Sequence, residues 1–358
     1  MIKTKNLKNV VDLIEWRSKH KKDFVVNTKN LESWVDDTNK IYFTYQNGGS
    51  IPGDIVPNDI AHEHLATKLK IPREYYNRLQ TENPHVLRQN LNHGLRMEQG
   101  KNRLLRLLPY NNLEEGKYTL RGYLSNRFKI MDHNISLNML LEEIHENRLE
   151  IHTVNLTDKF FHLQLLFTDE EQKIVGQPWK FGIAIRDSEV GFANKEIYAF
   201  SYNLVCTNGM YNKVQIGRKQ KFIHRGSSLD IGLLSDKTIN LQTEVINQEW
   251  RDIIRYYCKK EWVKQLSDKI KIASNSEKIE NIEKAVDVTM KDYSIRQEYR
   301  DQLLRNLIDG GERNQFGMFQ AITSLANDKE SDIGVNFQQI GGKILDLSEA
   351  RWREYATI

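Results

Sequence analysis

The spacing of apolar residues first predicts a mainly helical region at residues 1–100. Apolar side chains recur at helical spacing over 5–22 and again over 59–69. Pro72 stands at the start of "PREYYNRL", where a proline favours the first turn of a further helix. The segment 41–54 is the exception, since "IYFTY" is typical of a strand and is followed by a Gly/Pro turn.

The pattern changes at residue 101, and residues 101–235 favour a β-rich core. Short apolar and alternating runs predict strands over 103–110, 117–132, 150–168, 179–211 and 219–226. One helix interrupts them, "NISLNMLLEEIHENR" at 134–148, with Asn134 or Ser136 as its cap. We expect this helix to cross a central antiparallel sheet.

Residues 236–358 return to helical spacing. The first helix, at 238–266, has an apolar face of Leu241, Val245, Trp250, Ile253, Ile254 and Tyr257. Further helices are expected at 277–308, ending at Gly310-Gly311, at 314–327 and at 343–355. Helices, then strands, then helices indicate an α+β fold, with regions 1–100, 101–235 and 236–358 either separate or in one integrated domain.

Composition narrows the class of protein and the compartment. Of 358 residues, 39% are hydrophobic and 28% are charged, which is typical of a folded soluble chain. Cys206 and Cys258 are the two cysteines, too few for a disulfide framework. The first residues contain no apolar signal-peptide core, and no stretch approaches 18 apolar residues. We therefore expect a cytoplasmic protein without a membrane partner.

The net charge is only +4, so an argument for nucleic-acid binding has to rest on how the charged residues are distributed along the chain. In "LRGYLSNRFKIMDH" (120–133), strand alternation places Leu120, Leu124 and Phe128 on one face. The other face carries Arg121, Tyr123 and Arg127, with Lys129 close behind. Two guanidinium groups around an aromatic ring suit phosphates and a stacked base. A polar face that simply meets water explains the same alternation.

A second basic stretch lies at 212–226. It contains no acidic residue and has five basic residues beside its histidine, namely Lys213, Arg218, Lys219, Lys221 and Arg225. Nucleic-acid binding and a solvated hairpin that turns at Gly217 are both compatible with this segment.

The sequence patterns that could indicate a catalytic or metal-binding site are weak. His62 and His64 are two residues apart, whereas a helical zinc site needs a spacing of four, so we interpret them as surface or capping residues. Asp187, Glu189 and Glu196 could in principle hold a metal for a nuclease, but scattered acids among strands are common. No other metal, cofactor or nucleophile pattern is present, so we expect a protein without cofactor that is not an enzyme.

Four stretches, in order across about 120–328, resemble elements of the phage/plasmid-like protein family, a domain of unknown function found on bacteriophages and plasmids. "LRGYLSNRFKIMDH" resembles R-x-F-L-S-x-R-Y-x-x-I-D, and "DSEVGFANKEIYAFSYNLVCTNGMY" (187–211) resembles N-S-E-x-G-x-x-S…V-C-x-N-G-M. "FIHRG" (222–226) and "NQFGMFQAITSLAND" (314–328) resemble the family's R-H-x-G and W-x-x-x-N-A-x-T-x-x-x-x-H elements. Phe128 stands where a tyrosine is usual, and Asp328 stands where a histidine is typical.

This resemblance implies a mobile-element protein without an established activity. The order of elements is also similar to that of single-strand annealing proteins. The favoured hypothesis is a non-enzymatic protein that binds or anneals single-stranded DNA in recombination or replication and self-associates into homo-oligomers. A structural or counter-defence factor that binds other proteins is the alternative, and a metal-dependent nuclease is the least favoured.

Overall fold

The structure, a computed structural model, describes residues 2–4, 7–46, 53–98, 100–110, 116–212, 221–222, 236–327, 329 and 331–358. Helices and two largely antiparallel sheets alternate in blocks along the chain, so the α+β prediction is confirmed. In the described residues, no helix combines the length and the apolar character that crossing a membrane requires.

The large sheet has seven strands in the order β1–β8–β9–β10–β11–β12, with β13 also paired to β11. All its pairings are antiparallel. Its strands are β1 (Ile2–Thr4), β8 (Leu149–Leu156), β9 (Phe161–Ile174), β10 (Gln177–Asp187), β11 (Lys195–Asn203), β12 (Asn208–Asn212) and β13 (Lys221–Phe222).

The small sheet has six strands in the order β2–β6–β7–β5–β4–β3, and only β5 and β7 pair in parallel. Its strands are β2 (Lys22–Asn27), β3 (Leu31–Val35), β4 (Ile41–Tyr45), β5 (Asp54–Pro57), β6 (Asn102–Pro109) and β7 (Lys117–Ser125). It therefore joins strands from both sides of residue 100. Among these strands, the sequence pattern had indicated only β4, β6 and β7.

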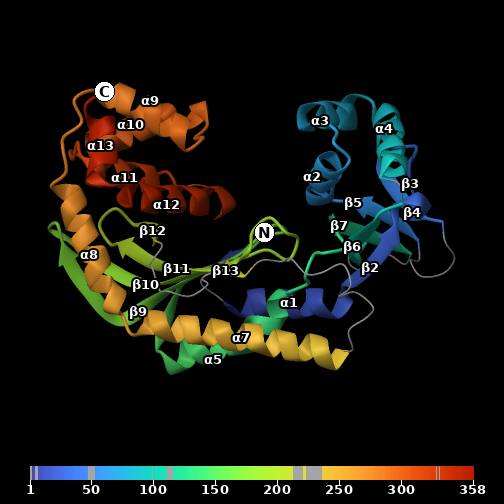
Figure 1. The fold of residues 1–358 in the computed structure, drawn as a ribbon, viewed down its shortest axis with the longest axis horizontal. Coiled ribbons are helices and arrows are strands. Elements are labelled where there is room, and N and C mark those ends of the chain that lie inside the picture. The colour runs from blue at the N-terminus through green and yellow to red at the C-terminus, as the bar shows by residue number, and fades with distance from the viewer. Residues whose placement is uncertain are drawn as a thin grey trace.

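The helices lie in three groups (Figure 1). The group on the small sheet is α2 (Asp59–Lys68), α3 (Arg73–Glu82) and α4 (Pro84–Met97). Along one face of the large sheet lie α1 (Leu7–His20), α5 (His133–Glu146), α7 (Asp236–Cys258) and α8 (Glu261–Ser274). The C-terminal group is α9 (Ile282–Asp292), α10 (Arg300–Asp309), α11 (Gln315–Ser324), α12 (Ser331–Leu345) and α13 (Glu349–Ala356). Short 3-10 turns occur at η1 (Thr28–Asn30) and η3 (Gln297–Tyr299).

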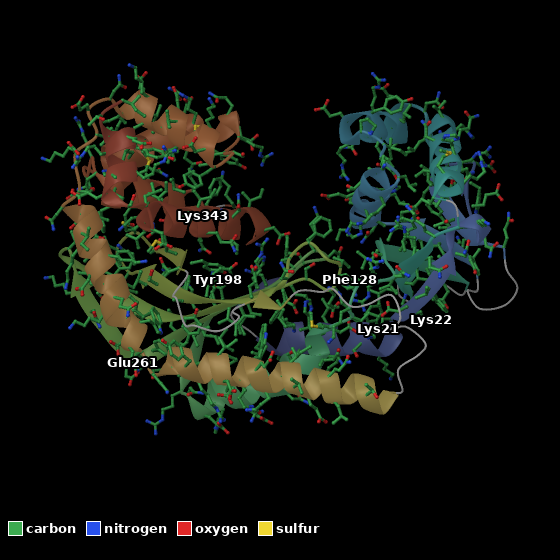
Figure 2. All side chains as sticks on the ribbon, in the orientation of Figure 1. Lys21, Lys22, Phe128, Tyr198, Glu261 and Lys343 are labelled. Atoms are coloured by element: carbon green, nitrogen blue, oxygen red, sulfur yellow. The ribbon has the colours of Figure 1, made fainter. Side chains whose placement is uncertain are left out.

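Helices cover both faces of the large sheet. In the first half of β9, from Phe161 to Phe167, every side chain is buried. Alternate residues face α5 and α7 on one side, while Leu166 and Tyr198 belong to an apolar cluster that includes Val335 of α12 on the other. Figure 2 shows Tyr198 on the sheet face beneath α12. This double cover explains why the strand reads as a continuous apolar run.

The apolar cores of the two halves are separate. One cluster joins the large sheet to α1, α5 and the helices from α7 onward, and the other joins the small sheet to α2, α3 and α4. Between them, the second face of the small sheet meets the end of α1, the start of α5 and the loop 188–194. We call this contact region the junction.

Several helix boundaries differ from the predictions. Asn58, just before the segment expected to be helical, caps α2, because its side chain accepts a hydrogen bond from the Ala61 amide at 3.0 Å. Asp132 occupies the cap position of α5. The helix expected over 277–308 is two helices, since Ser294 adopts a left-handed φ of 52° between α9 and α10. The predicted apolar face of α7 is buried only from Trp250 onward.

Candidate nucleic-acid interface

Strand β7 carries Arg121 and Tyr123, which the alternation placed on a presented face. Both are buried, with exposed fractions of 4% and 0%. A β-bulge explains the error, because Arg121 is the extra residue between Leu120 and Gly122, which pair with consecutive positions of β6. Beyond the bulge the alternation reverses, so Tyr123 joins Leu120 in the core of the small sheet. The prediction that Arg121, Tyr123 and Arg127 share one presented face of the strand is therefore wrong.

Each of these buried groups has a partner inside the protein. Arg121 Nη2 lies 2.9 Å from Glu189 Oε2, in the loop after β10. The Tyr123 hydroxyl donates to Glu98 Oε2 at 2.7 Å. Burial and the Glu98 carboxylate raise the pKa of Tyr123, so the phenol stays protonated. Arg121 thus links the small sheet to the loop 188–194 across the junction, whereas Tyr123 and Glu98 pair within the small-sheet half.

Arg106 of β6 is the most deeply buried cation at the junction. It is 0% exposed and forms ion pairs with Asp23 at 2.9 Å and Asp132 at 2.6 Å. It also donates to the main-chain oxygen of Glu189 at 2.7 Å, and Lys21 forms a further ion pair with Asp132. Burial alone would lower the pKa of Arg106, but Asp132 and Asp23 raise it above its usual range. The guanidinium therefore links both halves while remaining charged.

His133, at the start of α5, lies between two carboxylates. Its ring nitrogens are 3.6 Å from Asp187 Oδ2 and 3.4 Å from Glu189 Oε1. Burial lowers the pKa of His133 more than the two carboxylates raise it. Burial would raise the pKa of Glu189, but His133, Arg121 and Arg106 hold it well below its usual range. At neutral pH the junction thus contains an uncharged imidazole and an ionised Glu189.

The three acids considered for a nuclease are engaged by other groups. Asp187 Oδ2 lies 2.9 Å from Lys195 Nζ, Glu189 is paired as described, and Glu196 accepts a hydrogen bond from the Tyr198 hydroxyl. Over the described part of the chain, no three His, Cys, Asp or Glu side chains are arranged to hold a metal ion. Asp187 and Glu189 serve as counter-ions for buried cations.

Beside the junction, aromatic rings and cations form a continuous series that we call the aromatic–cation row. It consists of His64 of α2, Phe192 of the loop 188–194, Lys159 and Phe160 before β9, His162 of β9 and Arg186 of β10. The centroids of the His64 and Phe192 rings are 5.0 Å apart, and those of Phe160 and Phe192 are 6.2 Å apart. Lys159 Nζ lies 4.7 Å from the Phe192 centroid, and Arg186 Cζ lies 4.4 Å from that of Phe160.

The row connects helices from opposite ends of the chain. His64 supplies its contact with α2, while His162 Nε2 lies 3.3 Å from Asp332 of α12. Arg186 Nη1 donates to Gln339 Oε1 of α12 at 3.3 Å. The row therefore extends from α2 to α12. Figure 1 shows these two helices on the same side of the strands.

Arg186 differs from the cations of the junction. Its side chain is half-buried, and its Nε is covered without a hydrogen-bond partner in the described chain. Within those residues it forms no ion pair, although Glu196 is its neighbour across to β11. An arginine with a covered, unsatisfied donor and no counter-ion is suited to an anionic ligand. The sequence signal for this site was the interleaved "KFFH" at 159–162, which sequence analysis did not single out.

Of the remaining predicted site residues, Arg127, Lys129 and Lys221 lie near the loop 188–194 and the start of β11. Arg127 is exposed and Lys129 half-buried in the segment after β7. Between them, Phe128 packs close to Gly191, and Figure 2 shows it between the two halves. Lys221 belongs to β13, whose main chain pairs with Lys195 and Glu196. Lys213, Arg218, Lys219 and Arg225 lie outside the described residues.

The two histidines of "AHEHLA" have separate surroundings. His62 is buried, and its Nδ1 lies 2.7 Å from the Tyr76 hydroxyl, so the surface or capping role expected for it is wrong. His64 is half-buried and accepts a hydrogen bond from the Tyr123 amide at 3.3 Å. Burial lowers the pKa of each to about 4, so both are neutral at neutral pH.

Comparison with known proteins assigns no relatives to this arrangement. No protein-family model matches the chain, and neither the curated proteins nor the solved structures contain a match.

Proposed function

We propose that this protein is a non-enzymatic nucleic-acid-binding protein that holds a single strand along the aromatic–cation row. Proteins that bind single strands combine base-stacking rings with cations that follow the phosphates. The row offers the ring faces and edges of His64 and Phe192 together with the charges of Lys159 and Arg186. Single-stranded DNA is the favoured partner, in recombination or replication.

The main support for the proposal is that the guanidinium of Arg186 has no carboxylate partner in the described chain. The cations of the junction are matched by carboxylates, and Lys159 Nζ also has one, 2.9 Å away on Glu63. Arg186 instead contacts a ring and an amide, with its Nε unsatisfied in the described chain. A phosphate oxygen against the half-buried guanidinium of Arg186 would supply the missing counter-charge. A base on Phe192 would extend the stack that already contains His64.

The two basic segments of the sequence support the same surface. Asn212 ends β12 and Lys221 begins β13, and both strands pair with β11. Arg127 and Lys129 lie in the segment that packs on Gly191. The main chain of Lys221 thus lies opposite the start of β11, which follows the loop that carries Phe192. There its charge and those of Arg127 and Lys129 would add to the attraction of a strand.

Fluorescence anisotropy of a labelled single-stranded oligonucleotide tests the proposal. Replacing Arg186 with Ala should weaken binding roughly tenfold, the loss expected for one charge-assisted contact. The slope of log K against log salt should fall by about 0.7, which corresponds to one phosphate contact. Arg305→Ala, an exposed arginine of α10 remote from the row, serves as the matched control and should bind as the unchanged protein does. Absence of any binding at low salt contradicts the proposal.

The family resemblance and the cellular setting belong to the same proposal. A phage/plasmid-like, mobile-element origin agrees with a single-strand binder, since recombination and replication expose single strands. The free Cys206 and Cys258 support a reducing cytoplasm. Annealing proteins act as assemblies, so we expect homo-oligomers.

A second candidate function is a protein-interaction factor. It is favoured by Leu241 and Val245, one turn apart on α7 and 53% and 59% exposed. Adjacent exposed apolar side chains mark contact surfaces in soluble proteins. Light scattering tests it: a Leu241→Ser, Val245→Ser double variant should be monomeric if this face forms the contact, and an unchanged mass contradicts that role.

A further inference from the structure

A cavity of about 290 Å³ lies away from the aromatic–cation row, between α10, α11 and the turn from β11 to β12. Figure 1 shows this end of the molecule, where α11 lies over β12. The volume is close to the lower limit of ligand pockets, so it suits a small molecule.

The lining of the cavity has one sign of charge. Asp309 and Glu312 contribute carboxylates, and the lining contains no lysine, arginine or histidine. The C-terminal end of α10, where unpaired carbonyls carry partial negative charge, lies at the same rim. In a chain with a net charge of +4, this concentration of acceptors is local. It favours a cationic ligand.

Two glycines bring the Glu312 carboxylate to this position. Gly311 turns the chain after α10 with a φ of 74°, a conformation that suits glycine. Gly317 has to lack a side chain, because a Cβ there would lie 1.7 Å from the Glu312 carbonyl oxygen. Asn314, which is 3% exposed, then donates to Glu312 Oε2 at 3.1 Å. The carboxylate is thus held by a buried amide rather than free to rotate.

The rest of the lining completes a polar end and an apolar floor. Asn306 Nδ2 donates to the Ala321 carbonyl at 3.1 Å, which leaves its Oδ1 as a further acceptor. Phe316 and Ala321, each 2% exposed, form the apolar floor. Acceptors together with an apolar surface in one lining match a charged nitrogen on a short aliphatic stem.

We propose that this cavity binds a small organic cation, an ammonium or guanidinium group on a short aliphatic chain. The charged nitrogen donates to the carboxylates of Asp309 and Glu312 and to Asn306 Oδ1. The aliphatic stem packs on Phe316 and Ala321. This site is separate from the proposed nucleic-acid surface, and its test requires no nucleic acid.

Titration calorimetry of the full chain with 1,4-diaminobutane tests the inference. The diamine should bind saturably, one molecule per chain, whereas 1,4-butanediol and succinate, of similar length, should not bind. Asp309→Asn and Glu312→Gln should each weaken the diamine about tenfold, the loss expected for one charge-assisted contact. Asp301→Asn, an exposed acid in the first turn of α10 outside the lining, is the matched control and should leave binding unchanged.

Cys206 lines the cavity and provides a second readout. In a Cys258→Ser background, the diamine should slow alkylation of Cys206 by iodoacetamide, and the Asp309→Asn variant should lose this protection. Equal binding of the diol, equal weakening by Asp301→Asn, or alkylation that the diamine does not slow overturns the inference.

Discussion

The junction and the aromatic–cation row both contain buried or half-buried arginines. The two regions differ in whether a carboxylate pairs with the guanidinium. At the junction, Arg106 and Arg121 are buried and each is matched by a carboxylate at 2.9 Å or less. In the row, a few residues away along the large sheet, Arg186 lies over a ring and lacks such a match in the described chain. An arginine next to an aromatic residue in the sequence is therefore weak support for binding, because the partner of the guanidinium decides its role.

This difference indicates that the junction stabilises the fold, whereas the row is the region that we propose to bind nucleic acid. Burying a charge is tolerated only when it is paired, so the junction charges must stay together for the two halves to remain joined. A half-buried cation with a spare donor is available to an outside anion. Substitutions in the two regions should consequently separate the loss of stability from the loss of binding.

The largest effect is expected at Arg106. Replacing it with Met leaves Asp23 and Asp132 without their shared cation, and should lower the free energy of unfolding by roughly 3–5 kcal/mol. Urea denaturation measures the change. Arg353→Met, which removes exposed pairs with Glu277 and Glu349, is the control and should change stability by about 1 kcal/mol or less. Equal effects of the two variants would remove the distinction between paired and exposed cations.

Acid should weaken the junction. The pKa of His133 is lowered by burial, and that of Glu189 lies well below its usual range, so the unfolded chain takes up these protons more readily. Their contribution is complete above about pH 6.5 and declines as the pH falls, first through His133 and then, below about pH 4.5, through Glu189.

Urea midpoints measured from about pH 7.5 down to about pH 4 should decrease steadily, and the decline should be smaller in a His133→Gln variant. His62, His64 and His162, whose pKa burial also lowers, supply the remainder of the decline. A midpoint that does not change until below about pH 4.5 contradicts the role assigned to His133.

The smallest effect is expected at Arg127. It is exposed beside the proposed surface, so Arg127→Ala should change the free energy of unfolding by less than about 0.5 kcal/mol. If a phosphate lies against it, the salt slope of single-strand binding should fall by about 0.7. An unchanged slope in the anisotropy titration would confine the strand to the row itself.

Sequence patterning gave a correct account of the elements with a regular period. Helix spacing identified α1, α2, α5 and α7, and the β-rich centre crossed by α5 was predicted together with the α+β class. The pattern failed where one residue changes the period. The bulge at Arg121 reverses the faces of β7, and the left-handed Ser294 divides one expected helix into two.

The site depended on contacts that alternation cannot reveal. Phe192 and Phe160 lie in loops more than 30 residues apart, and His64 comes from a helix nearly 100 residues earlier. Helical spacing also marked Leu241 as core, although it does not specify which surface covers a helix face. Which arginine is paired and which is available follows only from the three-dimensional arrangement.

The central claim is tested most directly by measuring both stability and single-strand affinity for Arg121→Ala and Arg186→Ala. Arg121→Ala should lose roughly 3 kcal/mol of stability, because Glu189 is left buried without its partner, while its folded fraction binds with the original affinity. Arg186→Ala should keep its stability within about 1 kcal/mol and bind roughly tenfold more weakly. The account is contradicted if folded Arg121→Ala loses binding while Arg186→Ala retains it.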